Sequence, residues 1–297
     1  MPEAAIGARL PEAPVKKSSE FLRIMKQMSY NKMAMFGLIL FLVELVVCLL
    51  APVLPLKYGY NDLNFAEMGV APNAAHWFGT DELGRDIFTR ILYGGRYSIT
   101  MGLFSIVISV FVGAVIGSIA GYFGGQVDNI IMRILDIIQS LPALLLTIVV
   151  SAALGAGYFN TILALSVNGI PAMARMLRAQ MMRVRNNEYV EAAESINCSR
   201  FRTIVNHLIP NSFTPLLVQA TMGVANRILM ASSLSFIGLG VQPPAPEWGA
   251  MLSGSRQYIR DFPHMVIFPG LAIAVTVLAL NLLGDGLRDA LDPRLKK

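Results

Sequence analysis

Charged residues are scarce in this chain, and histidine and cysteine are scarcer still. Only 14% of the 297 residues are Asp, Glu, Lys or Arg, whereas 55% are hydrophobic. A soluble globular domain carries roughly 25% charged residues, so this composition excludes an ordinary soluble protein of the same length. We therefore expect a membrane protein that crosses the bilayer several times.

The motifs that would make the chain an ATPase or a hydrolase are also missing. No G-x-x-x-x-G-K-[ST] phosphate loop occurs, and the glycine-rich stretch 121–125 lacks the lysine and the strand that such a loop needs. These glycines are expected to form a turn, and any ATP hydrolysis belongs to another polypeptide. We expect no catalytic set, no metal and no other cofactor. A minor alternative lets His76 and His264 contact a metal chelate outside the membrane.

The hydrophobic residues form six stretches, each long enough for the roughly 20 residues that a membrane-spanning helix needs. They lie near 33–54, 97–121, 129–154, 158–180, 212–238 and 264–284. Proline interrupts the last four, which suits a transport path better than a lipid anchor. Lys and Arg collect before the first stretch and between the fourth and fifth, so both termini are predicted to be cytoplasmic. The net charge of +5 is then a sign of topology, and no nucleic-acid partner is expected.

The predicted fold is an all-α polytopic membrane protein, in which one N-terminal transmembrane helix precedes a five-helix core. Between the first two spans, Ile87, Phe88, Ile91 and Leu92 form an apolar stripe opposite Asp86, Thr89 and Arg90. This pattern predicts an amphipathic helix on the outer membrane surface. The predicted organisation is a cytoplasmic tail with an interfacial helix (1–32), the first span (33–54), an extracytoplasmic segment (55–96), the five-helix core (97–284) with a cytoplasmic loop (181–211), and a C-terminal tail (285–297).

Residues 189–211 predict two short amphipathic helices joined by a turn. Apolar residues recur at i, i+3, i+4 and i+7 in each half: Tyr189, Ala192, Ala193 and Ile196, then Phe201, Ile204, Val205 and Leu208. Asn197 tolerates a left-handed backbone at the turn, and Ser199 can cap the second helix. Pro210 is expected to end that helix.

The order of residues in this loop resembles the coupling loop of ABC importer permeases. The resemblance rests on Glu191, Ala192, Ala193, Asn197, His207, Ile209 and Pro210, with Asn197 in place of the usual turn glycine. Four more runs are similar to peptide-type importers, in particular to the second permease of dipeptide, oligopeptide, nickel and glutathione transporters. They read FGTDELGRDIFTRILYGGRYSI, AGYFGGQVDNIIMRILDIIQSLPALLL, LSFIGLGVQPPAPEWGAM and GDGLRDALDPRLKK.

The resemblance implies a bacterial or archaeal plasma (inner) membrane protein that is not itself an enzyme. Its implied partners are a homologous permease, two cytoplasmic ATPases that hydrolyse ATP, and an external substrate-binding protein. A peptide is the expected substrate, and glutathione or a nickel chelate is the alternative. The residues expected at the ATPase contact are Tyr189, Glu191, Ala192, Ala193, Ile196, Asn197, Phe201, Ile204, His207 and Pro210. The competing interpretation of the loop is an amphipathic hairpin that packs on its own bundle.

Five residues of the fifth stretch recur every three or four positions and so share one helical face. They are Gln219, Met222, Asn226, Met230 and Ser233. We expect them to line the translocation path, where amides and thioethers suit a peptide. Hydrogen bonding between helices is an equally weighted alternative. Trp248 and its neighbour Glu247 are expected at the outer gate or the binding-protein side.

Ionisable residues at membrane depth are functional candidates, because each is costly there unless paired or hydrated. Glu44, Arg133, Asp136 and Arg227 qualify. Arg133 and Asp136 are expected to pair at i, i+3, and Glu44 to meet either a polar group on a neighbouring helix or another subunit. The competing functions are a proton-coupled secondary transporter that uses Glu44 or Asp136, and a membrane-anchored scaffold.

Overall fold

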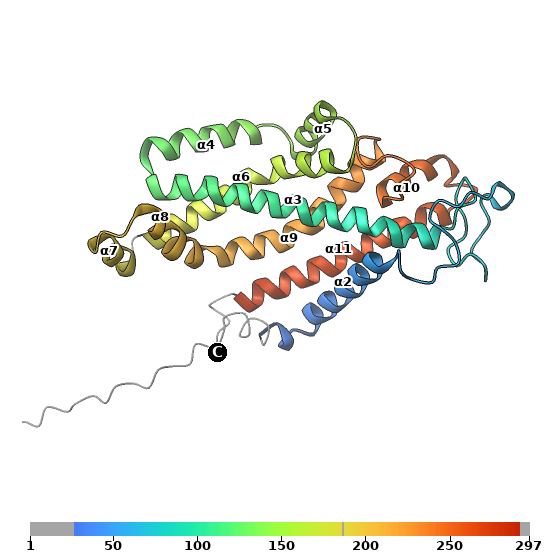
Figure 1. Cartoon of the computed structure of the whole chain (residues 1–297), viewed down its shortest axis with the longest axis horizontal. Coiled ribbons are helices and arrows are strands. Elements are labelled where there is room, and N and C mark those ends of the chain that lie inside the picture. The colour runs from blue at the N-terminus through green and yellow to red at the C-terminus, as the bar shows by residue number, and fades with distance from the viewer. Residues whose placement is uncertain (1–26, 186, 292–297) are drawn as a thin grey trace, which may run out of the picture.

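The computed structural model describes residues 27–185 and 187–291, except the side chains of Ala193, Glu194 and His207. The described chain is an elongated bundle of helices that run along the long axis of the molecule (Figure 1). The α-helices are α2 (Lys32–Leu50), α3 (Ile87–Phe123), α4 (Gly125–Gln139), α5 (Ala143–Leu154), α6 (Tyr158–Arg185), α7 (Glu188–Ser195), α8 (Arg200–Thr203), α9 (Ile209–Phe236), α10 (Trp248–Ser255) and α11 (His264–Leu291). Short helical turns cover Phe65–Glu67, Ile204–Leu208 and Arg256–Tyr258.

The centre of the bundle is the contact between α3 and α6, on which α9 also packs. Glycines let these two helices approach closely. A Cβ atom on Gly117 would lie 2.4 Å from the carbonyl oxygen of Ala174, and one on Gly113 would lie 2.6 Å from Cβ of Met173. Small residues at such positions are typical of helix pairs that cross in a membrane. On the other side of α9, α11 packs against α9 and carries α2 on its outer flank.

Three helices are long and apolar enough to cross a membrane: α2, α3 and α11. The pair α4 and α5 would meet the same test together, but the two helices are bent by 87° at the break between them. The helices α6 and α9 have 28 residues each, yet they are too polar for that test. The all-helical membrane class is thus confirmed, while the count of six spans and the cytoplasmic termini stay predictions.

The span predicted at 129–154 is not one straight helix. Helix α4 ends at Gln139 and α5 begins at Ala143, directly after Pro142. Proline disfavours the helical backbone in the residue before it and removes a donor from the helix ladder, so the break falls at this position. The glycine turn expected just before α4 is confirmed, because Gly124 and Gly125 have φ angles of 62° and 54°.

The amphipathic surface helix predicted around residues 87–92 is wrong as a separate element. These residues form the first turns of α3, which continues without a break for 37 residues. Its polar side is not exposed either, because Asp86, Thr89 and Arg90 are all buried. The segment before α3 folds over this end of the helix and supplies partners for these side chains. His76 Nδ1 lies 2.9 Å from an Asp86 oxygen, and Arg90 Nη1 donates to the Tyr60 carbonyl oxygen at 2.9 Å.

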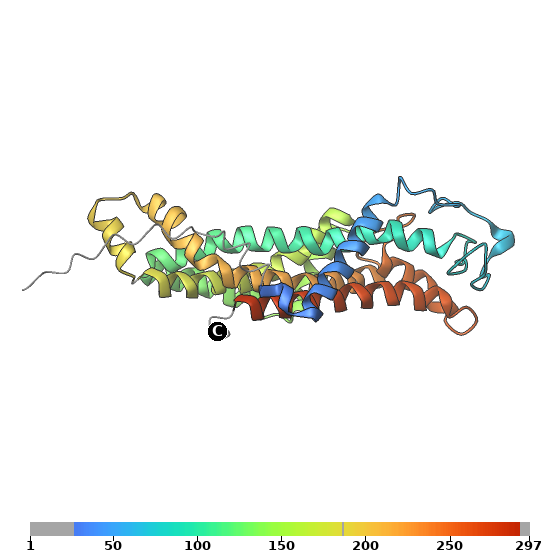
Figure 2. The ribbon, with the colours of Figure 1, turned by 90° about the horizontal axis from the view of Figure 1, so that it is seen from below.

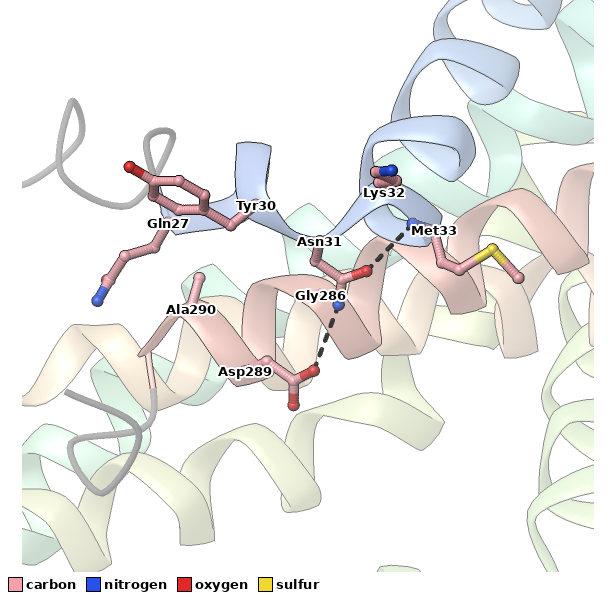
Figure 3. A pocket seen from close by; sticks show the side chains of 8 residues that line it. All are labelled: Gln27, Tyr30, Asn31, Lys32, Met33, Gly286, Asp289 and Ala290. Atoms are coloured by element: carbon pink, nitrogen blue, oxygen red, sulfur yellow. Dashed lines mark hydrogen bonds between the residues drawn. The ribbon is translucent and has the colours of Figure 1, made fainter. Parts of the chain in front are cut away.

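The start of α2 lies beside the last turns of α11. The side chain of Asn31 caps α2 by accepting hydrogen bonds from the Met33 and Ala34 amides, and its own amide donates to Asp289 at 3.4 Å (Figure 3). Helix α11 runs on to Leu291, beyond the expected end of the sixth span at 284. The interfacial helix expected before residue 32 lies mostly outside the described residues, of which 27–30 are helical.

Candidate functional site: the loop 187–211 and the face of α9

The turn in the loop 187–211 has the backbone that the sequence predicts. Asn197 has a φ angle of 58° and is the sole non-glycine residue with positive φ in the described chain. Helix α7 ends at Ser195, and Ser199 caps α8 by accepting a hydrogen bond from the Arg202 amide at 3.4 Å. Both local signals, the αL-tolerant Asn and the N-capping Ser, are therefore confirmed.

Pro210 does not end the second loop helix, contrary to the prediction. Helix α8 passes into a five-residue π-helical segment, Ile204–Leu208, and then directly into α9, in whose first turn Pro210 lies. Proline lacks the N–H donor of a helix ladder, and the wider π turn just before it, in which the Ile209 amide donates to the Ile204 carbonyl oxygen, changes that ladder at this point. The loop helix and α9 are consequently one continuous rod.

The apolar face of the loop is largely exposed at one end of the bundle (Figures 1 and 2). Ile196 is 81% exposed and Phe201 is 76% exposed, while Tyr189 and Val205 are each 40% exposed. Glu191, Ala192 and Pro210 are exposed as well, whereas Ile204 is half-buried and Leu208 is fully buried. The hairpin thus anchors itself through Val190 and Leu208 and leaves its largest apolar side chains uncovered by its own bundle.

Arginines of α6, the helix that leads into the loop, tie that helix to α3 and α4. Arg178 forms two hydrogen bonds with the Asp128 carboxylate of α4, and Arg175 donates to Asp136 of α4 at 2.8 Å. Arg185 donates to the Tyr122 carbonyl oxygen at the end of α3 at 2.9 Å. The predicted pair of Arg133 with Asp136 is therefore wrong, because the α6 guanidinium reaches Asp136 across the helix interface.

The five residues predicted to line the path do share an accessible side of α9. Gln219, Asn226 and Ser233 are exposed, and Met222 and Met230 are half-buried. Gln219 and Met222 also line a cavity of about 440 Å³, together with Met176 and Arg288. Hydrogen bonding between helices contributes at one point, where the Asn168 amide lies 3.7 Å from the Met230 sulfur. Their place on a translocation path stays a prediction.

Arg227 lies next to Asn226 on α9 but points into the bundle. Its Nη1 donates to the Leu165 carbonyl oxygen of α6 at 2.7 Å, and the side chain is buried. Gly169 of α6 makes room for it, since a Cβ atom there would lie 2.0 Å from Nη2 of Arg227. Among the described residues no carboxylate forms an ion pair with it. This buried cation ties α9 to α6 rather than facing the exposed side.

Glu44 meets a polar group on a neighbouring helix, which is one of its two predicted alternatives. The Thr276 hydroxyl of α11 donates to Glu44 Oε1 at 2.6 Å, and Oε2 is buried. This contact joins α2 to α11 inside the chain.

Trp248 and Glu247 lie in the core, contrary to the expectation of an outer surface contact. Both are completely buried. Trp248 Nε1 donates to the Ile91 carbonyl oxygen at 2.9 Å, and Glu247 accepts from the Ala250 amide at 2.8 Å and the Ser98 hydroxyl at 2.9 Å. Burial raises the pKa of the Glu247 carboxyl, while these hydrogen bonds oppose the rise. The pair offers no surface to a binding protein here, and a place in the outer gate stays a prediction.

His76 and His264 have separate partners. His76 lies between Asp86 and Glu67, and His264 Nε2 lies 3.2 Å from the Thr80 carbonyl oxygen. Among the residues that the structure describes, no group of three or more His, Cys, Asp or Glu side chains is placed to hold a metal ion.

The arginine contacts between α6 and α4 were not predicted from the sequence, although a signal exists. Asp128 and Asp136 are eight residues apart and so share a face of α4. Arg175 and Arg178 are three residues apart on the following long helix. An acidic stripe on one helix and a basic stripe on a nearby helix predict ion pairs where the two helices pack together, and we call these contacts between α4 and α6 the seam.

Comparisons with known proteins agree on one family. Residues 113–297 match the family described as binding-protein-dependent transport system inner membrane component, and residues 19–74 match the N-terminal TM domain of oligopeptide transport permease C. The chain is 42% identical over 286 residues to the dipeptide transport system permease protein DppC of Alkalihalophilus pseudofirmus, covering 96% of this chain and 94% of that protein. It is 39% identical over 294 residues to the glutathione transport system permease protein GsiD of Escherichia coli O6:K15:H31, covering 99% and 97%.

Solved structures show the same fold at low sequence identity. An inward-facing structure of the MetNI methionine ABC transporter has a TM-score of 0.55 at 16% identity and covers 69% of this chain and 98% of that one. An amino acid ABC transporter with histidines has a TM-score of 0.52 at 14% identity and covers 67% and 92%. The sequence matches, one over more than half of the chain and one at 42% identity over nearly all of it, show that this chain belongs to the family of binding-protein-dependent transport system inner membrane components.

Proposed function

We propose that this chain is a permease subunit of an ATP-driven peptide importer and couples to cytoplasmic ATPases through residues 189–211. It forms half of the translocation path, beside a homologous permease, in a plasma (inner) membrane with both termini in the cytoplasm. Two ATPases supply the energy, and an external binding protein delivers the substrate. The chain itself carries out no chemical conversion.

The observation that carries this proposal is the exposure of Ile196 and Phe201 at the end of the loop. Large apolar side chains that gather on a water-facing surface mark a contact with another protein. They lie on either side of the Asn197 turn, at one end of the long axis of the bundle (Figure 2). A partner that covers both side chains holds the tip of the hairpin. This supports docking over a hairpin that merely packs on its own bundle.

The substrate assignment rests on the relatives. Proteins similar over nearly the whole chain are named as dipeptide and glutathione transport permeases. Both substrates are small peptides or resemble them, which favours a peptide here, with glutathione as the second candidate. A nickel chelate remains the weaker alternative.

The contacts of two acidic residues also weigh against a stand-alone proton-coupled transporter. Glu44 is engaged by Thr276, and Asp136 is engaged by Arg175. Each carboxylate has a structural partner on a neighbouring helix, so neither is a free carrier at the centre of an aqueous path.

The docking test replaces one exposed apolar side chain with a charge. Phe201→Asp and Ile196→Asp should each abolish co-purification of the ATPases and ATP-dependent uptake, while the amount of permease in the membrane stays unchanged. Leu63→Asp is the matched control, because Leu63 is an apolar residue 53% exposed in the extracytoplasmic segment. Normal ATPase binding by both loop variants would reject the docking assignment.

The transport test uses proteoliposomes that contain both permeases and both ATPases, with the binding protein outside. Uptake of a labelled dipeptide should require ATP and binding protein, and it should exceed uptake of glutathione and of a nickel chelate. Uptake by this chain alone under a pH gradient would instead establish a secondary transporter.

A further inference from the structure

A cluster of titratable side chains lies where the segment 51–86 folds over the start of α3 (Figure 1). It consists of Glu67, His76 and Asp86, and we call it the His76 cluster. His76 is 3% exposed and Asp86 is 5% exposed. The two ring nitrogens of His76 face different carboxylates: Nδ1 lies 2.9 Å from an Asp86 oxygen, and Nε2 lies 3.4 Å from a Glu67 oxygen. The Tyr58 ring stacks on the imidazole, with 4.4 Å between the two ring centroids.

Asp86 depends on His76 for a counter-charge. The nearby carboxylates of Asp81 and Glu82 pair with arginines, whereas His76 is the one side chain of the described residues that lies within ion-pair distance of Asp86. Asp86 is also the N-cap of α3, where its other oxygen accepts a hydrogen bond of 2.8 Å from the Thr89 amide. A buried carboxylate is costly unless it is paired and hydrogen-bonded, so the His76 ring supports both this charge and the start of α3.

The protonation state of His76 decides how many of these contacts can form. A neutral imidazole has one N–H group, so it donates to a single carboxylate and turns a lone pair towards the other. A doubly protonated ring donates to both. The contact with the buried Asp86 is the shorter one, so a neutral ring keeps its proton on Nδ1. Loss of one proton therefore breaks the contact between Nε2 and Glu67.

The Glu67 contact ties an exposed apolar surface to the start of α3. Glu67 ends the short turn Phe65–Glu67, and the oxygen that faces His76 also accepts a hydrogen bond of 2.6 Å from the Asn64 side chain. Large apolar side chains of this turn and its neighbours are exposed, with Leu63 at 53%, Phe65 at 62% and Met68 at 49%. The proton on His76 Nε2 thus decides whether this surface is held by the ring.

The other titratable groups beside the cluster have contacts of their own. Lys57 is exposed and lies over the Tyr58 ring, 4.9 Å from its centroid. His264 of α11 packs against this segment from the far end of the sequence, and its Nε2 lies 3.2 Å from the Thr80 carbonyl oxygen. In the part of the chain that the structure describes, no carboxylate lies within ion-pair distance of His264, and the nearby arginines pair with Asp81.

We propose that the His76 cluster is a pH-sensitive contact, which closes in acid when doubly protonated His76 joins Asp86 to Glu67 and opens when the ring loses a proton. Histidine ordinarily titrates near pH 6.5, so the change falls between about pH 5 and about pH 8. Because the contact with Glu67 needs the doubly protonated ring, its contribution to stability is present on the acid side and is lost as the pH rises. The cluster lies at the end of the bundle opposite the loop 187–211 (Figure 2), and under the proposed function this end faces the outside.

The direct test counts the protons on the ring. The full chain is labelled with ¹⁵N in its three histidine rings, and the NMR signals are assigned with the variants His207→Gln and His264→Gln. Below about pH 6 both ring nitrogens of His76 should carry protons, and Nε2 should lose its proton as the pH rises while Nδ1 keeps its own. A proton that leaves Nδ1 first, or a ring that does not change between about pH 5 and about pH 8, would overturn the proposal.

The variant Glu67→Gln separates the effect of the proton from the shape of the contact. Glutamine can pair with either state of the ring, because its oxygen accepts from a protonated Nε2 and its amide donates to an unprotonated one. As the pH rises from about 5.5 to about 8, the melting temperature of the wild type should fall by a few degrees relative to that of Glu67→Gln. His264→Gln is the matched control and should keep the wild-type dependence, because His264 faces a carbonyl oxygen.

A third variant, His76→Gln, should lose the same pH dependence, since no titrating ring remains in the cluster. If this buried substitution prevents folding, Glu67→Gln still decides the question, because the Glu67 side chain is 44% exposed and tolerates replacement. Equal pH dependence of the melting temperature in the wild type and in Glu67→Gln would overturn the proposal. Both measurements use the purified full chain without ATPases or substrate, so their outcome is independent of the proposed import.

Discussion

The single residues that decide local structure here act through one backbone angle or one buried polar atom. Asn197 is left-handed at the tip of the loop, and Glu247 caps α10 inside the core. Each has a substitution that changes one physical property and leaves the others in place. Such pairs of variants separate backbone strain from lost hydrogen bonds.

At Asn197, the two substitutions to compare are glycine and valine. Glycine adopts a φ of 58° without steric cost, whereas a β-branched residue in that region costs about 1–2 kcal/mol. We expect Asn197→Gly to bind the ATPases as the wild type does, and Asn197→Val to bind them at least several-fold more weakly. Co-purification at equal expression measures this. Identical behaviour of the two variants would mean that the turn tolerates an ordinary backbone.

At Glu247, the comparison is between glutamine and leucine. Glutamine keeps an acceptor for the Ala250 amide and a polar group for Ser98, and it removes a charge that burial disfavours. Leucine leaves both partners unpaired, at about 1–3 kcal/mol each. Glu247→Gln should therefore melt at or above the wild-type temperature, and Glu247→Leu clearly below it. A melting temperature of Glu247→Gln clearly below the wild type would show that the carboxylate is needed in ionised form.

At the scale of elements, pattern and propensity predict where helices form. They do not predict which proline breaks a helix or which charged residues pair. The apolar periods predict α2, α3, α6, α9 and α11 to within several residues at most ends, because burial and lipid both require a continuous helix. Pro142 lies at the break between α4 and α5, whereas Pro210 lies within a continuous helix, and the presence of a proline alone does not distinguish the two outcomes.

In the candidate site, too, the sequence predicts the features that depend on local residues and not those that depend on neighbouring helices. The Asn197 turn and the Ser199 cap are local, so the sequence is sufficient to predict them. The partners of Asp136 and Trp248 depend on which helices become neighbours, and a single sequence does not state this.

The seam between α4 and α6 gives a test at this scale. Asp128 holds the guanidinium of Arg178 with both oxygens, and the Asp128 side chain is 10% exposed. Asp128→Arg should destabilise the chain by more than the roughly 1–3 kcal/mol of a lost charged hydrogen bond, because two guanidinium groups then face each other. The double variant Asp128→Arg, Arg178→Asp should recover much of that loss in melting temperature. The matched variant Asp128→Asn keeps the shape of the side chain and removes its charge. If the double variant does not recover stability, Asp128 and Arg178 do not form a stabilising pair.

At the scale of the whole molecule, the loop 187–211 and the segment 51–86 lie at opposite ends of the bundle (Figures 1 and 2). One continuous helix leads from the loop towards the other end, since α8, the π segment and α9 run without interruption from Arg200 to Phe236. A displacement at Phe201 is therefore passed to the residues from Gln219 to Ser233 without an intervening loop. The π segment is an irregular point at which this helix can adjust its register, and Pro215 is a second interruption of its hydrogen-bond ladder.

This continuity predicts how the α9 face responds to the ATPase cycle. Single cysteines at Gln219, Asn226 and Ser233, introduced after Cys48 and Cys198 are replaced by alanine, should react with a small hydrophilic thiol reagent. Their reactivity should change when ATP and binding protein are supplied, because closing one gate removes water from that part of the path.

Ala225 is the matched control, since it is 1% exposed and is turned about 100° from Asn226 around the helix. Val218 and Ser232 are unsuitable as controls because each lines a cavity. Labelling that is equal at Asn226 and Ala225, or that stays constant in every nucleotide state, would place this face against protein and remove α9 from the path.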